Sequence, residues 1–387
     1  MRLFGWRARI FAAVMMSSAA LLVLPGVSAR ADAPGELIAA AAAPDGFRGM
    51  SGGAIVDYWT TRSNGEPVKA SGALFVPPGP APAGGWPIMA YDHGTAGLGP
   101  ACGGQTDTTH LSRPMEDNVL QYFLGKGFAV VAPDYLGSGR FDTGPHPYLE
   151  LRTEATATID LVKAARQARP ELSRTWAVTG FSQGGHSALG TGYIQRTEAP
   201  DLDFRGTIAL DPASDIEKVA PLVGPYVPAI AGQAGDAVDG FVISMLAGLR
   251  ATHPEIDLDA NYLSPRGREI LDQASSLCFK DIMKIAGGSS IGELLSRPLN
   301  DDRFTTAFND YLAVPTSGYD APILLLLNTN DITVPSPLHA ALAAQFAANG
   351  VDFQTVVGTG SHTQLNPQMW SAIDAFSARI LATPTKS

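Results

Sequence analysis

The chain has 387 residues, enough to bury a large hydrophobic core in one or two domains. Hydrophobic residues make up 45% of it and charged residues 17%, a balance typical of a globular protein that excludes a disordered chain. Its 37 acidic residues outnumber its 27 basic residues, which argues against nucleic acid or an anionic membrane as an electrostatic partner.

Residues 1–31 have the features of a signal peptide. Three arginines within the first nine residues precede an apolar stretch, 10–24, that is too short to span a bilayer comfortably. The triplet Ala29-Arg30-Ala31 is a small-x-small cleavage site. We therefore expect secretion, into the medium or the periplasm and cell envelope, with cleavage near Ala31; an uncleaved membrane anchor is the alternative.

Beyond the signal peptide, apolar runs alternate with segments of helical periodicity. The predicted strands are Ala54–Thr60, Gly72–Val76, Pro87–Tyr91, Phe128–Ala132, Thr175–Thr179, Gly206–Leu210, Ile323–Leu327 and Phe353–Val357. The predicted helices are Asp117–Gly125, Arg152–Ala168, Gln183–Arg196, Pro337–Asn349 and Pro367–Leu381. This alternation predicts an α/β fold with a mostly parallel, doubly wound sheet. The alanine run at 39–43 is expected to be surface or leader-like.

One long segment breaks the alternation. Residues 214–318 have a helical and mixed pattern without a clear strand. We therefore expect a helical lid or cap here, inserted into a core made of residues 32–213 and 319–387. A gating insertion and a purely structural one are equally compatible with the pattern.

The strongest local motif is Gly180-Phe181-Ser182-Gln183-Gly184, which follows a predicted strand and opens a predicted helix. A serine on such a sharp strand-to-helix turn has an exposed hydroxyl and is a candidate nucleophile. The N–H of Gln183 would lie at the N-terminus of the helix, where it can donate a hydrogen bond to an oxyanion. An ordinary turn serine is the alternative.

A serine nucleophile needs a general base, and the base needs an acid that orients it. His362 follows the last predicted strand, and Asp331 follows the strand at 323–327, in the chain order expected after Ser182. Asp211, at the end of the strand 206–210, is the rival for the acid. His186, one turn into the helix after Ser182, is expected only to pack.

The loop after the third predicted strand reads Asp92-His93-Gly94-Thr95. The backbone N–H of Gly94 or Thr95 is the candidate for the second oxyanion donor. An ordinary glycine turn is the alternative, and Asp92 is a candidate orienting carboxylate.

The chain has two cysteines, Cys102 and Cys278. In an exported protein such a pair indicates one disulfide, and two buried free thiols are the alternative. The cysteines and histidines do not have the spacing of a metal site, so no metal or organic cofactor is expected.

Taken together, these motifs resemble the secretory lipase family, the group similar to Candida lipase A, from about Gly72 to Phe376. The resemblance is carried by His93-Gly94-Thr95 with Cys102, Pro133-Asp134-Tyr135-Leu136-Gly137, Gly144-Pro145-His146-Pro147-Tyr148-Leu149, Gly180 to Gly185, Ala251-Thr252-His253-Pro254, Gly267, Cys278-Phe279, Asp331 and His362. Members of that family can carry an acidic residue in the oxyanion loop, where this chain has His-Gly-Thr.

The resemblance implies an α/β-hydrolase fold, the triad Ser182, Asp331 and His362, a disulfide from Cys102 to Cys278 and a helical lid. It also implies hydrolysis of carboxylic esters, including acylglycerols, by a secreted serine hydrolase.

The expected partner is a small-molecule or lipid ester, with transient contact at a lipid interface, and the chain is expected to be a monomer. The apolar runs Val219–Val227 and Phe241–Leu249 are suited to covering an acyl channel, although packing against the sheet would explain them equally well. The alternatives are a short-chain carboxylesterase, a serine peptidase of the same fold and a non-catalytic binding protein.

Overall fold

A computed structural model describes residues 32–42, 48, 50, 52–100, 102–106, 113–230 and 232–382. The expected signal peptide lies outside the described residues. Within the described part of the chain, no helix is both long and apolar enough to cross a membrane.

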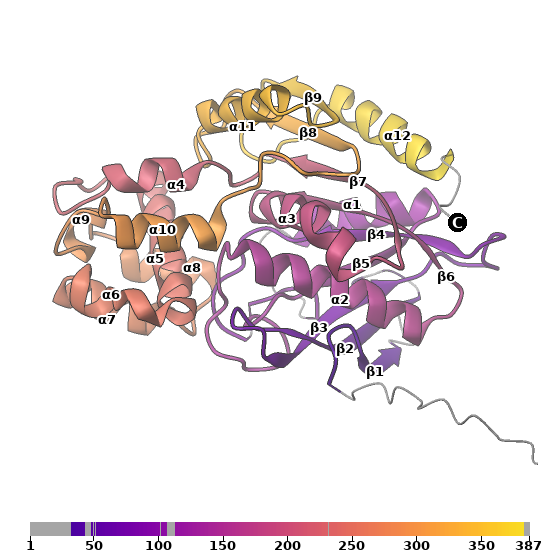
Figure 1. Ribbon diagram of the computed structural model, residues 1–387, viewed down its shortest axis with the longest axis horizontal. Helices are drawn as coiled ribbons and strands as arrows, with labels where there is room; N and C mark the ends of the chain where they lie inside the picture. The colour runs from indigo at the N-terminus through magenta and orange to yellow at the C-terminus, as the bar shows by residue number, and fades with distance from the viewer. Residues whose placement is uncertain are drawn as a thin grey trace, which may run out of the picture. The chain divides into compact units, whose positions relative to one another are not determined.

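Among the described residues, nine strands form one mixed, mostly parallel sheet in the order β1-β2-β3-β5-β4-β6-β7-β8-β9 (Figure 1). They are β1 (Leu37–Ala42), β2 (Gly53–Thr61), β3 (Pro67–Phe75), β4 (Trp86–Asp92), β5 (Ala129–Pro133), β6 (Leu172–Phe181), β7 (Asp203–Leu210), β8 (Ile323–Asn328) and β9 (Phe353–Gly358). β1, β2, β3 and β5 pair antiparallel, and every pairing from β5 through β4 to β9 is parallel. The predicted fold class and all eight predicted strands are confirmed.

The alanine run near residue 40 lies at the surface, as expected, but it also forms a strand that the sequence did not predict. It forms β1, an edge strand that pairs antiparallel with β2, and its alanines remain exposed. Alanine has little intrinsic preference for strands, so the sequence pattern carries no strand signal here. The strand forms because β2 offers an unpaired edge, and such pairing overrides local preference.

Helices cover both faces of the sheet, as a doubly wound fold requires. In the described part of the chain, the helices outside the long insertion are α1 (Arg113–Gly125), α2 (Leu151–Ala168), α3 (Gln183–Glu198), α11 (Ser336–Ala348) and α12 (Pro367–Ala382). On one face α1 and α12 bury Phe123 and Phe376 against the sheet. On the other face α2 and α3 pack against β2 and β6, where Tyr58 and Trp176 are fully buried. Burying each large apolar side chain contributes about 1.5–3 kcal/mol.

The segment between β7 and β8 is helical, as predicted, and lies to one side of the sheet, at the left of Figure 1. Its elements are α4 (Ile216–Val219), the 3₁₀ helices η1 (Ala220–Leu222) and η2 (Pro254–Ile256), α5 (Gln233–Thr252), α6 (Leu258–Asn261), α7 (Pro265–Ala274), α8 (Phe279–Ala286), α9 (Ile291–Leu294) and α10 (Asp302–Leu312). Side-chain caps start several of them: Ser264 caps α7, Asp301 caps α10, and Ser290 forms a capping box with Glu293 at α9.

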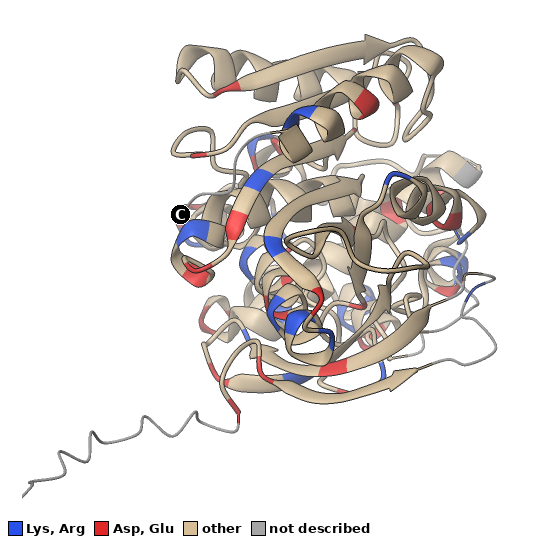
Figure 2. Cartoon of the chain, turned by 90° about the vertical axis from the view of Figure 1, so that its right-hand side faces the viewer, with Lys and Arg blue, Asp and Glu red and all other residues tan. Residues whose placement is uncertain are grey.

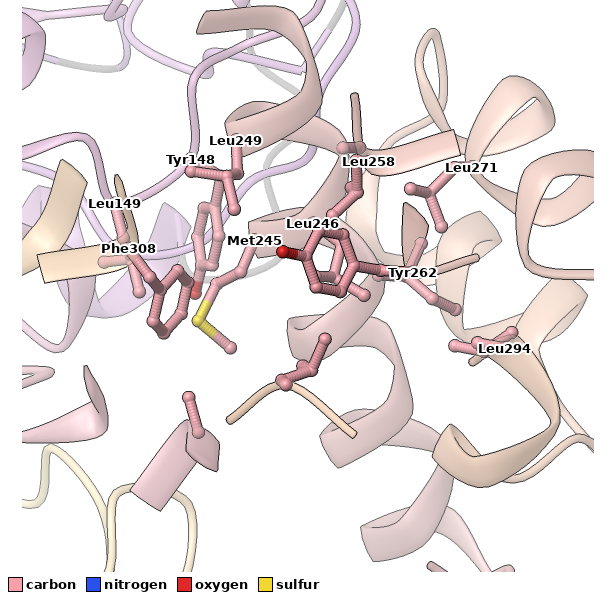
Figure 3. Close-up of a cluster of buried hydrophobic side chains, with 14 of the residues drawn as sticks. Tyr148, Leu149, Met245, Leu246, Leu249, Leu258, Tyr262, Leu271, Leu294 and Phe308 are labelled. Carbon is pink, nitrogen blue, oxygen red and sulfur yellow. The ribbon is translucent and has the colours of Figure 1, made fainter. Parts of the chain in front are cut away.

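This helical segment has an apolar core of its own, which continues into the sheet domain. Figure 3 shows Tyr148 and Leu149, from the loop before α2, beside Met245 of α5 and Phe308 of α10. The hydroxyl of Tyr311 also donates to the Tyr148 carbonyl (2.6 Å). The loop that precedes α2 is therefore held by the helical segment.

Cys102 and Cys278 form the expected disulfide, which closes a sequence separation of 176 residues. Backbone hydrogen bonds beside it join Leu98 N to Leu277 O (2.9 Å) and Phe279 N to Ala96 O (2.9 Å). On the loop-entropy model a link of this span contributes about 4–5 kcal/mol. The loop after β4 is thus tied to the helical segment both covalently and by backbone pairing.

Basic and acidic positions alternate along the described chain without a large segment of one sign, as the blue and red parts of the ribbon in Figure 2 show. Several of the chain's cations have local partners, for example Lys126 with Asp374 (2.5 Å). Surface pairs of this kind contribute about 0–1 kcal/mol each. Stability therefore comes mainly from the buried layers between helices and sheet.

The buried carboxyl group of Asp92 lies in those layers. Asp92 ends β4 and accepts hydrogen bonds from Thr158 of α2 (2.6 Å) and Ser187 of α3 (2.8 Å). Burial raises the pKa of Asp92 to about 8, although both hydroxyl donors oppose the shift. The folded protein therefore holds a proton on Asp92 near neutral pH.

This proton makes stability depend on pH. Between about pH 4 and pH 8 an unfolded chain releases the Asp92 proton while the folded chain retains it, so the free energy of unfolding falls as pH rises. Asp92→Asn mimics the protonated side chain. We expect its free energy of unfolding, measured by denaturant titration, to rise relative to that of wild type by about 1–3 kcal/mol as the pH increases from 5 to 8. The exposed Asp352→Asn is the control, and parallel pH curves for Asp92→Asn and wild type would contradict the account.

Candidate active site

The turn from β6 into α3 holds Ser182 in an uncommon backbone conformation, with φ 58° and ψ −121°. Such a conformation costs on the order of 1–3 kcal/mol in a non-glycine residue and persists only where the surroundings enforce it. An added Cβ at Gly180 would collide with the Gly184 carbonyl, and one at Gly184 would collide with the Asp92 carbonyl. The Ser182 N–H donates to Leu210 O (2.9 Å). Close packing of strand, helix and neighbouring strand thus enforces the turn.

The structure joins three predicted side chains in one hydrogen-bonded chain. His362 lies between β9 and α12, and its Nε2 is 2.8 Å from Ser182 Oγ. Its Nδ1 is 2.6 Å from Oδ2 of Asp331, in the loop after β8. Because a carboxylate only accepts, the hydrogen lies on Nδ1 and leaves the Nε2 lone pair directed at the serine hydroxyl.

Asp331 is held as an anion. Its Oδ1 accepts the N–H groups of Thr333 (2.8 Å) and Val334 (3.0 Å), and its Oδ2 accepts His339 Nε2 (3.0 Å) as well as His362. Burial alone would raise the pKa of Asp331, but the hydrogen bonds from the two histidines outweigh it and hold that pKa far below its usual range.

Asp211, the rival for the acid, does not contact His362 but supports the loops around it. Its Oδ1 accepts Asn328 N (2.7 Å), and its Oδ2 accepts the Asn328 side chain (2.8 Å) and Thr363 N (2.8 Å). Oxygen and nitrogen atoms of Asp211, Asp331 and His339 lie within 4.8 Å of one another, close enough to bind a metal ion. Each carboxylate oxygen of that cluster already accepts an N–H, however, so the geometry fits a hydrogen-bond network.

The predicted oxyanion residues lie beside this turn. Gln183 is the first residue of α3, directly after Ser182. A Cβ on Gly94 would lie 3.7 Å from the Phe181 carbonyl, so the loop after β4 runs along the turn. The hydroxyl of Thr95 is hydrogen-bonded to the hydroxyl of Tyr148 (2.8 Å). Gln183, Gly94 and Thr95 are therefore brought to the side of Ser182.

A buried carboxylate that sequence reasoning missed supports the start of α3. Glu154 of α2 accepts Gln183 Nε2 (2.6 Å) and His186 Nδ1 (3.2 Å). Burial opposes ionisation, yet hydrogen bonds from His146 and His186 lower the pKa of Glu154 to about 2. His186 is buried, as expected, and it also hydrogen-bonds Leu312 O (2.9 Å) at the end of α10. These contacts join separate helices, and no local motif signals them.

Ser182 lines an apolar cavity with a volume of about 500 Å³. This volume is within the range of small-molecule binding sites. Its walls come from the loop before α2, the segment after β7, α5 and the loop between β8 and α11. The lining residues are Tyr148, Leu149, Ser182, Ala213, Ile216, Val219, Val238, Phe241, Val242, Met245, Thr333, Val334, Pro335, Pro337 and Leu338. The four residues from α5 have the i, i+3, i+4, i+7 spacing of a single helix face.

Comparison with known proteins identifies the family to which the chain is similar. The secretory lipase family matches residues 104–386. A probable inactive lipase of Mycobacterium tuberculosis is 23% identical over 312 residues, 76% of this chain and 66% of its own length. The secreted triacylglycerol lipase LIP2 of Malassezia furfur is 23% identical over 257 residues, 62% of this chain and 50% of its own length. The chain thus spans between half and about two thirds of these relatives.

Solved structures share the fold. Candida antarctica lipase A has a TM-score of 0.74 at 19% identity, covering 92% of this chain and 84% of that one. The rice cell wall degrading esterase LipA of Xanthomonas oryzae has a TM-score of 0.66 at 22% identity, covering 90% and 97%. The sheet is accordingly that of an α/β-hydrolase. Because the family match extends over most of its length, the chain belongs to the secretory lipase family.

Proposed function

We propose that the protein is a secreted serine hydrolase that cleaves carboxylic esters, acylglycerols among them, through an acyl-enzyme on Ser182. The observation that carries the proposal is the hydrogen-bonded chain Ser182–His362–Asp331, whose serine lines an apolar cavity. In this arrangement Ser182 is the nucleophile, His362 the general base and Asp331 the acid that orients it.

The reaction follows from the contacts. His362 Nε2 takes the Ser182 proton as Oγ attacks the ester carbonyl, and ionised Asp331 stabilises the resulting imidazolium. The N–H of Gln183 and an N–H from Gly94 or Thr95 stabilise the tetrahedral oxyanion. The imidazolium then protonates the leaving alcohol, and water repeats both steps to release the carboxylic acid and free Ser182.

The cavity supports an apolar acyl group as the part of the substrate bound beside Ser182. Its lining is almost wholly aliphatic and aromatic, so a hydrocarbon chain gains by leaving water there. The helices between β7 and β8 supply much of this lining, which supports their role as a lid over the acyl site.

Exposed apolar side chains that are close in sequence to cavity-lining residues support contact with an ester–water interface. Leu222 is 70% exposed, Tyr226 65% and Ile332 77%. Tyr226 hydrogen-bonds the Leu222 carbonyl (3.0 Å), and Ile332 precedes the cavity residue Thr333. An acidic protein is repelled by an anionic surface. The exposed residues Leu222, Tyr226 and Ile332 should therefore bind a droplet of neutral ester better than an anionic membrane.

Loss of the nucleophile tests the proposed function. Ser182→Ala should reduce hydrolysis of p-nitrophenyl esters, from acetate to palmitate, by about 10⁴-fold or more while leaving the thermal unfolding midpoint close to wild type. A wild-type preference for long chains favours a lipase, and a short-chain optimum favours a carboxylesterase. Undiminished activity in the variant would refute Ser182 as the nucleophile.

Narrowing the cavity tests the acyl site. Val242→Trp places an indole among the lining residues of α5, so we expect the ratio of palmitate to acetate hydrolysis to fall about tenfold or more. Ala251→Trp, at an exposed position of the same helix, is the control. An unchanged ratio in Val242→Trp would show that the acyl chain binds elsewhere.

Replacing exposed apolar residues by aspartate tests contact with the ester–water interface. The double variant Leu222→Asp/Tyr226→Asp should lose about tenfold or more of its activity on emulsified triacylglycerol, because burying a carboxylate in oil is unfavourable. Its activity on soluble p-nitrophenyl acetate should change much less. Leu381→Asp, an exposed apolar position on α12, is the control, and equal losses on both substrates would contradict the interfacial role.

A further inference from the structure

A second histidine contacts the carboxylate that orients His362. His339 lies on α11, and its side chain is almost fully buried. Its Nε2 is 3.0 Å from Asp331 Oδ2, the oxygen that also accepts His362 Nδ1. The same Nε2 is 3.7 Å from Asp211 Oδ1. The sequence assigned no role to this histidine.

The protonation of His339 Nε2 follows from its neighbours. Both nearby oxygens belong to carboxylates that accept backbone hydrogen bonds, so the hydrogen between them and the ring lies on Nε2. The other ring nitrogen, Nδ1, is buried and has no hydrogen-bond partner among the described residues. An aliphatic side chain here would avoid that unpaired polar atom. The Nε2–H therefore explains a histidine at this position better than packing does.

We propose that His339 is a positioning residue that acts on the reaction through Asp331. Its N–H shares Oδ2 with His362, so it fixes the carboxylate relative to the imidazole and draws negative charge away from that hydrogen bond. Less charge on Oδ2 also stabilises the imidazolium of His362 less. The inference rests on the proposed roles of Ser182, Asp331 and His362.

The sign of this effect does not depend on the charge of His339. Whether neutral or protonated, the ring directs positive potential at Oδ2, and removing it leaves more negative charge for His362. Among the described residues, charged groups also reach α11. Asp211 lies near His339 and stays in every variant, and Asp215 and Lys218, which pair with each other, contact Gln345. Removal of His339 should therefore move the acidic limb of the kcat/KM profile to higher pH.

The test is a pH profile of p-nitrophenyl ester hydrolysis for His339→Leu and His339→Met, which remove the N–H and keep the site filled. Because Asp331 is then no longer fixed relative to the imidazole, we expect kcat to fall about tenfold or more with KM nearly unchanged. We expect the acidic limb to rise by about half a pH unit or more. Leu342→Ala, a buried packing change on the same helix, is the control and should leave the limb in place.

If the Leu and Met variants of His339 do not fold, two polar variants test the proposal instead. His339→Gln can place an N–H near the position of Nε2, whereas His339→Asn reaches only that of Nδ1. The Gln variant should keep the wild-type limb and a higher kcat than the Asn variant. The proposal would be overturned if the acidic limb did not move in the Leu and Met variants, or if it moved as far in Leu342→Ala. It would also be overturned if the Gln and Asn variants had the same limb and the same kcat. Full activity in Ser182→Ala would instead refute the proposed function itself.

Discussion

The site depends on one crowded turn. At the end of β6 the chain reverses into α3 so sharply that neither Gly180 nor Gly184 has room for a side chain, and Ser182 takes a positive φ. The turn holds because β4 and β7 pack on either side of it and α3 packs on the sheet behind it. Its strain is small against the apolar burial in those layers, and in return it presents the serine hydroxyl at the carboxyl edge of the parallel strands.

Buried carboxylates hold the loops that meet this turn. Asp92 links the end of β4 to α2 and α3, Glu154 holds the side chain of Gln183, and Asp211 braces the loops after β8 and β9. Asp92 and Glu154 differ in charge for a physical reason. Among the described residues the side-chain donors to Asp92 are two hydroxyls, and it retains its proton, whereas Glu154 has histidine partners and is ionised. Each converts a flexible connection into a fixed one, as a preorganised site requires.

Predictions from the sequence succeeded where the signal was local. The turn around Ser182 is marked by a motif of five consecutive residues with glycines at both ends. His362 and Asp331 each follow an apolar strand, so the order of the strands predicted that they lie at the same carboxyl edge of the sheet. Their hydrogen bonds are seen in the structure, while their roles, like the oxyanion donors, stay predictions. The strand β1 was missed because alanines carry no strand pattern.

Long-range partners could not be read from the chain. Glu154 meets Gln183 and His186 only where two helices pack, and sequence spacing reveals nothing of that contact. His339 is eight residues from Asp331, on an alanine-rich helix, and the packing of α11 against β8 turns it toward the carboxylate. The apolar cavity likewise needs helices that fold back over the turn.

Covalent trapping tests the central claim most directly. The protein would be incubated with a p-nitrophenyl alkylphosphonate, and p-nitrophenol release, intact mass and the modified peptide would be measured. The account predicts one equivalent of p-nitrophenol, one phosphonyl group per chain, located on Ser182, and loss of ester hydrolysis in proportion to labelling. Folded protein that hydrolyses esters but is not labelled, or that is labelled on a different residue, would contradict it.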